Sequence, residues 1–468
     1  MTNLLKTPKI VAIGAGSASF GLNTLAALIR SESLREAELA LVDRSEPSLQ
    51  LVGRLAARLN EEWHAGMRLT THAHHAGALE GADFVVLSIE VPPREKLWRR
   101  DFEIPLAHGV RQPYAENGGP GGFAHAARNI GPAIEIARDM EQACPAAWLI
   151  NYTNPMVRIC DAVSRYSTIK AAGLCHQLHV GYALVGLALA DDLGIQVPPG
   201  FTDSHASPHS RPARRAVAGQ ALEKIRIRAA GLNHFTWMLS VHDRRTGEDL
   251  YPLFRERWEA LPDSFEPLTR RVFRAFGLFP IPGDEHLCEY LPWMSDPVTR
   301  PWEKMDISLY DWEYWEADRG EGYAQIAAMA AGDEPISLLR TADSEGALEV
   351  IENISTAGAH HHEALNLPNR GQILNLPAGA IVETPGMVTG AGIHGVSVGV
   401  LPEPIAELCR RELSVVRLSV DAAVNGDRQA ALQCLLLDPV ITDMDLAQAI
   451  LDDYLAEYRE YLPQFWKM

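Results

Sequence analysis

Cysteine is scarce in this chain, with six residues in 468, scattered at positions 144, 160, 175, 288, 409 and 434. Such spacing excludes the dense disulfide framework of a small secreted domain. No apolar run reaches the roughly 18 residues that a membrane-spanning helix needs. The strand that begins near Ile10 is not preceded by an apolar segment with a cleavage site, so no signal peptide is predicted. We therefore expect a soluble, cytoplasmic protein with reduced thiols and no membrane partner.

Positive charge is also in short supply. The chain carries 42 Lys and Arg against 60 Asp and Glu, a formal net charge of −18 at pH 7. Because a surface of this sign repels nucleic acid, we expect no nucleic-acid partner and favour a small-molecule ligand. Hydrophobic content of 47% and charged content of 22% are typical of a globular protein. At about 150 residues per domain, the length predicts two or three domains.

The N-terminal region carries a strand, a glycine turn and a helix in succession. "KIVAI" (9–13) is an apolar run, "GAGS" follows, and apolar residues then recur at helical spacing from 23 to 29. A second strand, "ELALVDR", ends in an aspartate at the distance where an acidic residue accepts ribose hydroxyls. This pattern predicts a dinucleotide site, although Ser19 stands where GxGxxG would have its third glycine. The alternative is an ordinary tight turn. The candidate cofactor ligands are Gly14, Gly16, Ser17 and Asp43.

Further strands at 82–89, 146–153 and 169–175, with a helix around 129–142, predict a parallel, doubly wound sheet. The fold class is therefore α/β, with a Rossmann-like domain over residues 1–200. From 201 to 468 the pattern changes to a mixed α+β domain, which we expect to hold the substrate and metal and to form oligomer contacts. There, 225–243 alternates as a strand, and 405–461 is typical of two or three amphipathic helices.

Several of these strands end in polar residues. Asn151 and Asn154 close one strand, and the sequence "GLCH" brings Cys175 and His176 to the end of the next. Because open α/β sheets bind ligands beyond the carboxyl ends of their strands, these ends are candidate ligand contacts. A thiolate and an imidazole suit a transition metal, but a buried free cysteine is the simpler alternative for Cys175.

The ordered motifs "GAGS", "NYTNPM", "GLCH", "GLNHFTW", "GDEHLCEYLP" and "NLPNRGQILNLPAGAIVET" resemble glycoside hydrolase family 4 over nearly the whole chain. Within it, the α-galacturonidase-like branch, or a sister family acting on sulfoquinovosides, is most similar. The resemblance implies a glycosidase that uses NAD as a recycled cofactor and that also binds a divalent metal, expected to be manganese. It implies transient oxidation at C3 of the sugar, loss of the C2 proton, elimination of the aglycone, addition of water and re-reduction.

The resemblance also implies residue roles. Cys175 and His234 would hold the metal, and Asp284 would be the C2 base, with His286 as the second choice. Glu116 would protonate the leaving group, although the close branch has Asp-Thr where this chain has Glu116-Asn117. Asn154 would contact both cofactor and substrate. The remaining expected substrate contacts are Asn151, His176, Arg111 and Arg370.

Three residues bear on the identity of the substrate. Gln177 follows "CH" in place of the acidic residue expected of a galacturonidase. We therefore predict a glycoside with an anionic C6 group, either a uronate or a sulfonate. Arg111 and Arg370 are the candidate partners of that group, because guanidinium pairs with planar oxyanions.

Two other functions fit the same Rossmann half. One is an NAD-dependent dehydrogenase of a small hydroxy acid or sugar acid, and the other is a redox-sensing regulator without turnover. A thiolate metal site argues against the first, and the cluster of titratable residues around Asp284 argues against the second. The aromatic residues between 293 and 323 favour core or subunit contacts, so we expect a homodimer or homotetramer.

Overall fold

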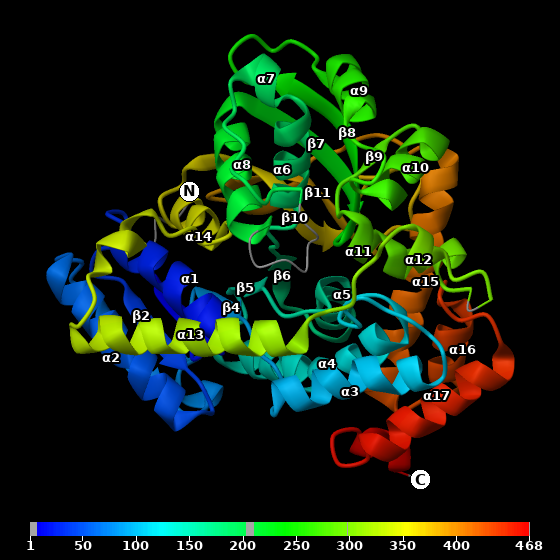
Figure 1. Ribbon diagram of the computed structural model, residues 1–468. Coiled ribbons are helices and arrows are strands. Elements are labelled where there is room, and N and C mark those ends of the chain that lie inside the picture. The colour runs from blue at the N-terminus through cyan, green and yellow to red at the C-terminus, as the bar shows by residue number, and fades with distance from the viewer. Residues whose placement is uncertain (1–6, 203–209, 297, 468) are drawn as a thin grey trace.

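The computed structural model describes residues 7–202, 210–296 and 298–467, and its centre is one large mixed sheet (Figure 1). Its first six strands run parallel in the order β3-β2-β1-β4-β5-β6. This is the doubly wound Rossmann order, so the predicted fold class is confirmed. The strands are β1 (Lys9–Ile13), β2 (Glu38–Val42), β3 (Arg68–His72), β4 (Phe84–Leu87), β5 (Trp148–Asn151) and β6 (Lys170–Gly173).

The central strands are apolar because helices cover both faces of the sheet. Alternate residues of β1 face opposite layers, with Ile10 and Ala12 in one core and Val11 and Ile13 in the other. The layer on the Ile10 side contains α1 (Ala18–Arg30) and α2 (Glu46–Glu62). The opposite layer contains α3 (Arg94–Ala107), α4 (Gly119–Ala143) and part of α5 (Met156–Tyr166).

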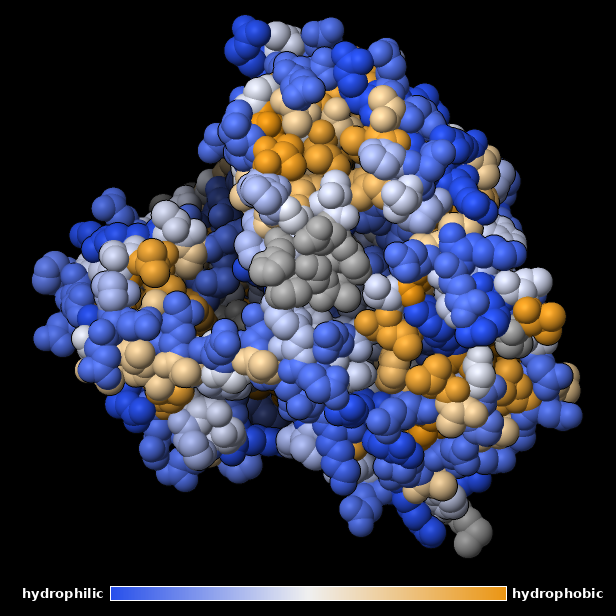
Figure 2. All heavy atoms as spheres, in the orientation of Figure 1, coloured by the Kyte–Doolittle hydropathy of each residue, from blue (hydrophilic) through white to orange (hydrophobic). Residues whose placement is uncertain are grey.

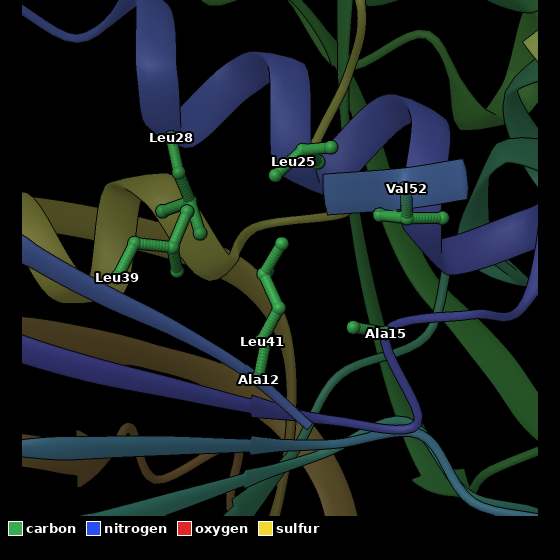
Figure 3. A pocket seen from close by; sticks show the side chains of 7 residues that line it. All are labelled: Ala12, Ala15, Leu25, Leu28, Leu39, Leu41 and Val52. Atoms are coloured by element: carbon green, nitrogen blue, oxygen red, sulfur yellow. The ribbon is translucent and has the colours of Figure 1, made fainter. Parts of the chain in front are cut away.

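A void of about 10 Å³ lies between α1, α2 and the two strands beneath them (Figure 3). Its lining is wholly apolar, and its volume is no larger than one water molecule needs. It is therefore part of the core packing. The lining residues are Ala12, Ala15, Leu25, Leu28, Leu39, Leu41 and Val52.

The sheet continues past β6 with antiparallel strands from the second half of the chain. Asn366 pairs with Gly173, which joins β10 to β6 across the predicted domain boundary. The order beyond β6 is β10-β11-β7-β8-β9, with β12 beside β11. The strands are β7 (Ile225–Leu232), β8 (Phe235–Asp243), β9 (Phe279–Pro280), β10 (Ala359–Pro368), β11 (Ile381–Thr389) and β12 (Gly392–Gly395).

The segment 225–243 is a hairpin, where the sequence predicted one strand. Asn233 and His234 form its turn, and His234 takes the left-handed value φ 62°. Apolar alternation continues through both strands, so the pattern alone does not reveal the reversal. The turn carries His234 back toward the end of β6.

Helices from the second half also cover the Rossmann sheet. Figure 1 shows α13 (Trp312–Ala331) lying across α1 and α2, and α14 (Ala347–Ser355) joins the same core. The predicted C-terminal helices are α15 (Glu403–Asn425), α16 (Arg428–Leu437) and α17 (Met444–Glu457), and they share a core with α4. The division near residue 200 stays a prediction. The other helices are α6 (Leu178–Ala188), α7 (Ala190–Leu193), α8 (Ser210–Lys224), α9 (Tyr251–Ala260), α10 (Pro267–Phe276), α11 (Asp284–Leu287) and α12 (Pro301–Lys304).

Within the described residues, no helix combines the length and the apolar character that crossing a membrane requires. On the face shown in Figure 2, hydrophilic residues dominate and the apolar ones form separate clusters. The six cysteines are free thiols, and all except Cys175 are buried.

Candidate active site

The glycine turn after β1 is held tightly between two strands. Gly14 has φ +84°, and a Cβ on it would lie 1.8 Å from the carbonyl oxygen of Ser88. The amide of Gly16 donates to Asp43 Oδ2 at 2.8 Å, and Ser45 N donates to the other carboxylate oxygen at 2.8 Å. Helix α1 begins directly after this turn, and the Ser17 side chain makes no capping hydrogen bond. The amides of a helix start and a carboxylate at the end of β2 fit a dinucleotide.

Replacing Gly14 with alanine should lower the free energy of unfolding by about 2–4 kcal/mol, because the backbone must shift and a positive φ is strained. Binding of NAD⁺, the predicted cofactor, should weaken at least about tenfold. Gly109 is the matched control, since it has φ +83° but open space around a Cβ. Gly109→Ala should cost only about 1 kcal/mol. Thermal unfolding and calorimetric NAD⁺ titration measure both, and equal behaviour of the two variants would contradict the prediction.

A cavity of about 850 Å³ opens from the glycine turn along the carboxyl ends of the parallel strands. It spans from Asp43 at one end to Cys175 at the other, as expected for a ligand site of this fold. Eight of the residues predicted from the sequence line it: Gly14, Gly16, Ser17, Asp43, Glu116, Asn154, Cys175 and His176.

Glu116 and Asn154 meet on the cavity wall. Glu116 Oε2 accepts hydrogen bonds from Asn117 Nδ2 at 2.8 Å and from Asn154 Nδ2 at 3.1 Å. Burial raises the pKa of Glu116, while His125 and Arg94 oppose the shift. Asn154 Oδ1 is buried and has no hydrogen-bond partner within the described ranges. The pair therefore offers a buried carboxyl group with a raised pKa and an open amide acceptor.

Cys175 and His234 converge from sequence-distant elements. Cys175 follows β6, His234 lies in the β7–β8 turn, and Sγ is 3.5 Å from Nε2. Bonds of about 2.3 Å to sulfur and about 2.1 Å to nitrogen would put two ligands of one metal ion roughly that far apart. Burial lowers the pKa of His234 well below its usual value, which keeps the imidazole neutral as a ligand must be. Burial raises the pKa of the Cys175 thiol, and a bound metal would reverse this by stabilising the thiolate.

A buried carboxylate holds the turn that presents His234. Glu383 Oε2 on β11 accepts from Asn233 Nδ2 and from Asn366 Nδ2, both at 2.8 Å. All three side chains are buried. The turn is thereby fixed to two neighbouring strands, which positions the His234 ring beside Cys175.

The two candidate bases differ in their surroundings. The ring of His286 lies 4.4 Å from that of His234 and 4.4 Å from that of Tyr114. Asp284, by contrast, accepts the backbone amides of Leu268 at 2.9 Å and Thr269 at 2.7 Å. Its two carboxylate oxygens therefore cap the start of α10. Neither residue lines the large cavity described above.

Among the expected sugar contacts, His176 and Asn151 lie in contrasting environments. His176 is half exposed in the cavity wall, with Nδ1 3.0 Å from Glu345 Oε1, and the charge of Glu345 raises its pKa. Asn151 is fully buried, and its amide bonds with the backbone of Thr153 in both directions. Asn151 thus stabilises the loop that carries Asn154.

Arg111 and Arg370 do not line the cavity. The Arg111 guanidinium donates to the carbonyl of Ile307 and stacks over Trp302 at 5.7 Å. Arg370 is exposed in the turn after β10. In the sequence, both arginines stand among amide and turn residues, which does not show whether their side chains face the cavity.

Other residues that line the cavity were not predicted from the sequence. Glu90, three residues beyond β4, pairs with the buried His125 at 2.7 Å. Burial alone would lower the pKa of His125, but Glu90 and Asp101 raise it to about 9. Glu90 could have been found from its place after a strand. Arg319 and Tyr323 lie on α13, far along the chain, and carried no such signal.

Two histidine-rich segments lie apart from Cys175. His360 and His362 are on strand β10, with ring centroids 6.1 Å apart. His75 forms a metal-capable group with Glu135 and Asp139, and its Nε2 lies 2.7 Å from Asp139. That pair already satisfies the histidine as an ion pair or hydrogen bond.

Comparisons with known proteins match this architecture. The chain is 28% identical to an alpha-glucosidase of Erwinia rhapontici, over 97% of this chain and 98% of the relative. It is 29% identical to an alpha-galacturonidase of Bacillus subtilis (strain 168), over 96% of both. The Bacillus subtilis protein lplD, assigned as a glucosidase, has a crystal structure that superposes with a TM-score of 0.81 at 28% identity, covering 96% and 100%.

A fold likeness extends to a 6-phospho-beta glucosidase from Thermotoga maritima solved with manganese, NAD⁺ and glucose-6-phosphate. Its TM-score is 0.76 at 22% identity, covering 97% of this chain and 99% of that one. The model of the family 4 glycosyl hydrolases matches residues 9–188, and the model of their C-terminal domain matches residues 229–441. These two matches span most of the chain, which therefore belongs to family 4 of the glycosyl hydrolases.

Proposed function

We propose that this chain is an NAD-dependent glycosidase for a glycoside with an anionic C6 group, either a uronide such as a galacturonide or glucuronide, or a sulfoquinovoside. The observation that carries the proposal is the 3.5 Å approach of His234 to Cys175, which lines the cavity that also contains the glycine turn; His234 itself lies behind Cys175 and does not line the cavity. A metal pair that borders the cavity of a dinucleotide cradle suits redox-assisted cleavage. The alpha-galacturonidase among the relatives supports an anionic sugar.

The chain's residues divide between two cofactors. Gly14, Gly16 and Ser17 would hold the cofactor diphosphate at the start of α1, and Asp43 its ribose. Cys175 and His234 would hold a divalent ion such as Mn²⁺. Bound NAD⁺ would supply a reversible hydride acceptor for C3 of the sugar, and the ion a Lewis acid for the C3 oxygen.

Glu116 and Asn154 act on the sugar itself. The open Oδ1 of Asn154 accepts a hydrogen bond from a sugar hydroxyl, which orients the ring. Glu116, whose pKa is raised by burial, acts as the general acid that donates a proton to the departing oxygen.

His286 becomes the stronger candidate for the base that removes the C2 proton. Its ring lies 4.4 Å from the His234 ring at an interplanar angle of 35°, whereas both carboxylate oxygens of Asp284 accept α10 amides. Asp284 stays the alternative. In that case it would accept the proton on a lone pair that the two α10 amides leave free.

The test is a panel of aryl uronides, hexosides, 6-phosphohexosides and a sulfoquinovoside, with NAD⁺ and Mn²⁺ added and withheld. We expect aglycone release from a C6-anionic member only when both cofactors are present, with no net NADH. Steady accumulation of one NADH per turnover would instead favour the dehydrogenase. Cleavage of neutral or phosphorylated members alone would contradict the substrate class.

Cytoplasmic location and assembly into a homodimer or homotetramer stay predictions. Part of the aromatic segment behind the oligomer prediction packs inside the protomer, where Trp98, Tyr310 and Trp312 form one cluster. Size-exclusion chromatography with light scattering measures the assembly state directly.

A further inference from the structure

Two arginines meet on the cavity wall beside Glu116. Arg94 begins α3, Arg319 lies on α13, and both line the cavity. Both also approach Glu95 Oε1, Arg319 Nε at 3.1 Å and Arg94 Nη1 at 3.7 Å. Two guanidinium groups from distant parts of the chain therefore face the same space.

Both arginines keep guanidinium donors that no carboxylate of the described residues accepts. Burial alone would lower the pKa of Arg94, but the charges of Glu90, Glu116 and Glu95 together raise it. Glu95 at 3.7 Å and Glu116 at 3.9 Å are nonetheless beyond hydrogen-bond distance of Arg94. Arg319 donates Nη1 to the hydroxyl of Tyr310 at 3.3 Å, but its Nη2 is buried without a partner in the described part of the chain. Guanidinium donors in this state fit a planar or tetrahedral oxyanion.

The position of the two arginines relative to the reacting carbons of the sugar indicates which oxyanion they bind. In a pyranose, C3 lies opposite the ring oxygen, whereas C1 and C5 both flank it. A sugar with C3 toward Cys175 and its leaving oxygen toward Glu116 therefore has C5 and C6 on the Glu116 side. Arg94 Nη2 lies 3.9 Å from Glu116 Oε1, so a C6 group would point toward the arginines.

We propose that Arg94 and Arg319 together bind the carboxylate or sulfonate at C6 of the substrate. This assignment rests on the proposed function and replaces Arg111 and Arg370 in that role. The cofactor diphosphate is the other source of oxyanion oxygens within reach. Its expected place is the start of α1, after the glycine turn. The hydroxyl of Tyr323, one helical turn beyond Arg319, donates a 3.0 Å hydrogen bond to the Gly16 carbonyl of that turn.

The test compares Arg94→Gln and Arg319→Gln on two substrates that differ only at C6. One is the best anionic aryl glycoside of the panel, and the other carries a neutral hydroxymethyl group. For the anionic substrate, kcat/KM should fall about 10- to 100-fold in each variant, as expected for the loss of a charge-assisted contact. For the neutral one, Arg319→Gln should change kcat/KM less than about threefold, because no contact to the substrate is lost. Arg94→Gln also removes a charge 3.9 Å from Glu116, so its effect is judged by the ratio of kcat/KM between the two substrates.

Arg99→Gln is the matched control. Arg99 is also on α3 and also bridges to α13, through Glu313 at 3.1 Å, but it does not line the cavity. It should leave both substrates unaffected. Arg319→Lys keeps the charge without the planar fork, so it should fold as the parent does and still lose part of the anionic preference. Melting temperatures of all variants check that each one is folded.

Calorimetric NAD⁺ titration separates the two sources of oxyanion. Unchanged NAD⁺ affinity with a collapsed preference for the anionic substrate supports the assignment. Weakened NAD⁺ affinity with equal losses on both substrates overturns it in favour of the cofactor diphosphate. If the parent enzyme cleaves the anionic glycoside and the variants keep its preference, the assignment alone fails. If the parent cleaves no C6-anionic glycoside, the proposed substrate class fails with it.

Discussion

Replacing Cys175 with serine should weaken metal binding and reduce glycoside cleavage about 1,000-fold, because the thiolate is one of the two proposed protein ligands, 3.5 Å apart. A serine hydroxyl is shorter, harder and far less acidic, so Mn²⁺ affinity should fall at least about 100-fold. Electron paramagnetic resonance of Mn²⁺ titrated into the protein measures the affinity, and aglycone release measures the rate.

NAD⁺ binding is the internal control for this variant. The glycine turn and Asp43 lie at the opposite end of the cavity, so the affinity for NAD⁺ should be unchanged. Cys144→Ser controls for the loss of a buried thiol elsewhere, at the end of α4. Full activity and retained manganese in Cys175→Ser would show that the metal assignment is wrong.

Replacing Glu116 with glutamine should slow cleavage of glycosides with poor leaving groups by about 100- to 10,000-fold, the range for loss of a general acid. Activated aryl glycosides should lose much less, because their leaving group departs without protonation. A series of substrates with graded leaving-group pKa measures the difference. Equal losses across the series would indicate that Glu116 only positions Asn154, whose amide it accepts at 3.1 Å.

The pH profile gives an independent reading of Glu116. A general acid must be protonated, so kcat/KM for a poor leaving group should fall as pH rises through its pKa. Burial raises that pKa, which moves this limb to higher pH than an exposed glutamate would show. In Glu116→Gln the limb should disappear, and in Glu116→Asp it should persist at reduced rate.

Local patterns located most elements of the Rossmann half. The apolar runs at 9–13, 84–87 and 148–151 are strands because both faces of a parallel sheet are covered, which leaves a continuous signal in sequence. The glycine turn was equally readable, since Gly14 occupies a backbone conformation and a space that no side chain tolerates. The hairpin at Asn233 and His234 was missed because alternation is the same on both of its strands.

Orientation at the ends of strands was beyond the sequence. Asn151 and Asn154 are three residues apart, yet one bonds within its own loop and the other opens into the cavity. Asp284 has the carboxylate that a base needs, but each of its two oxygens accepts a backbone amide at the start of α10. Such outcomes depend on neighbours that pack from elsewhere, and no local pattern encodes them.

The sequence by itself determined the residue types that the chemistry needs: a glycine turn with Asp43, a cysteine at the end of a strand, and a carboxyl at Glu116. These are local requirements of backbone conformation and side-chain chemistry, so they are visible in order along the chain. Only the tertiary structure decided which of them meet. Cys175 reaches His234 through a hairpin turn, and Arg94 meets Arg319 because α13 folds back over the N-terminal sheet. Contacts of this kind arise from packing between distant elements, and so they appear only once the chain has folded.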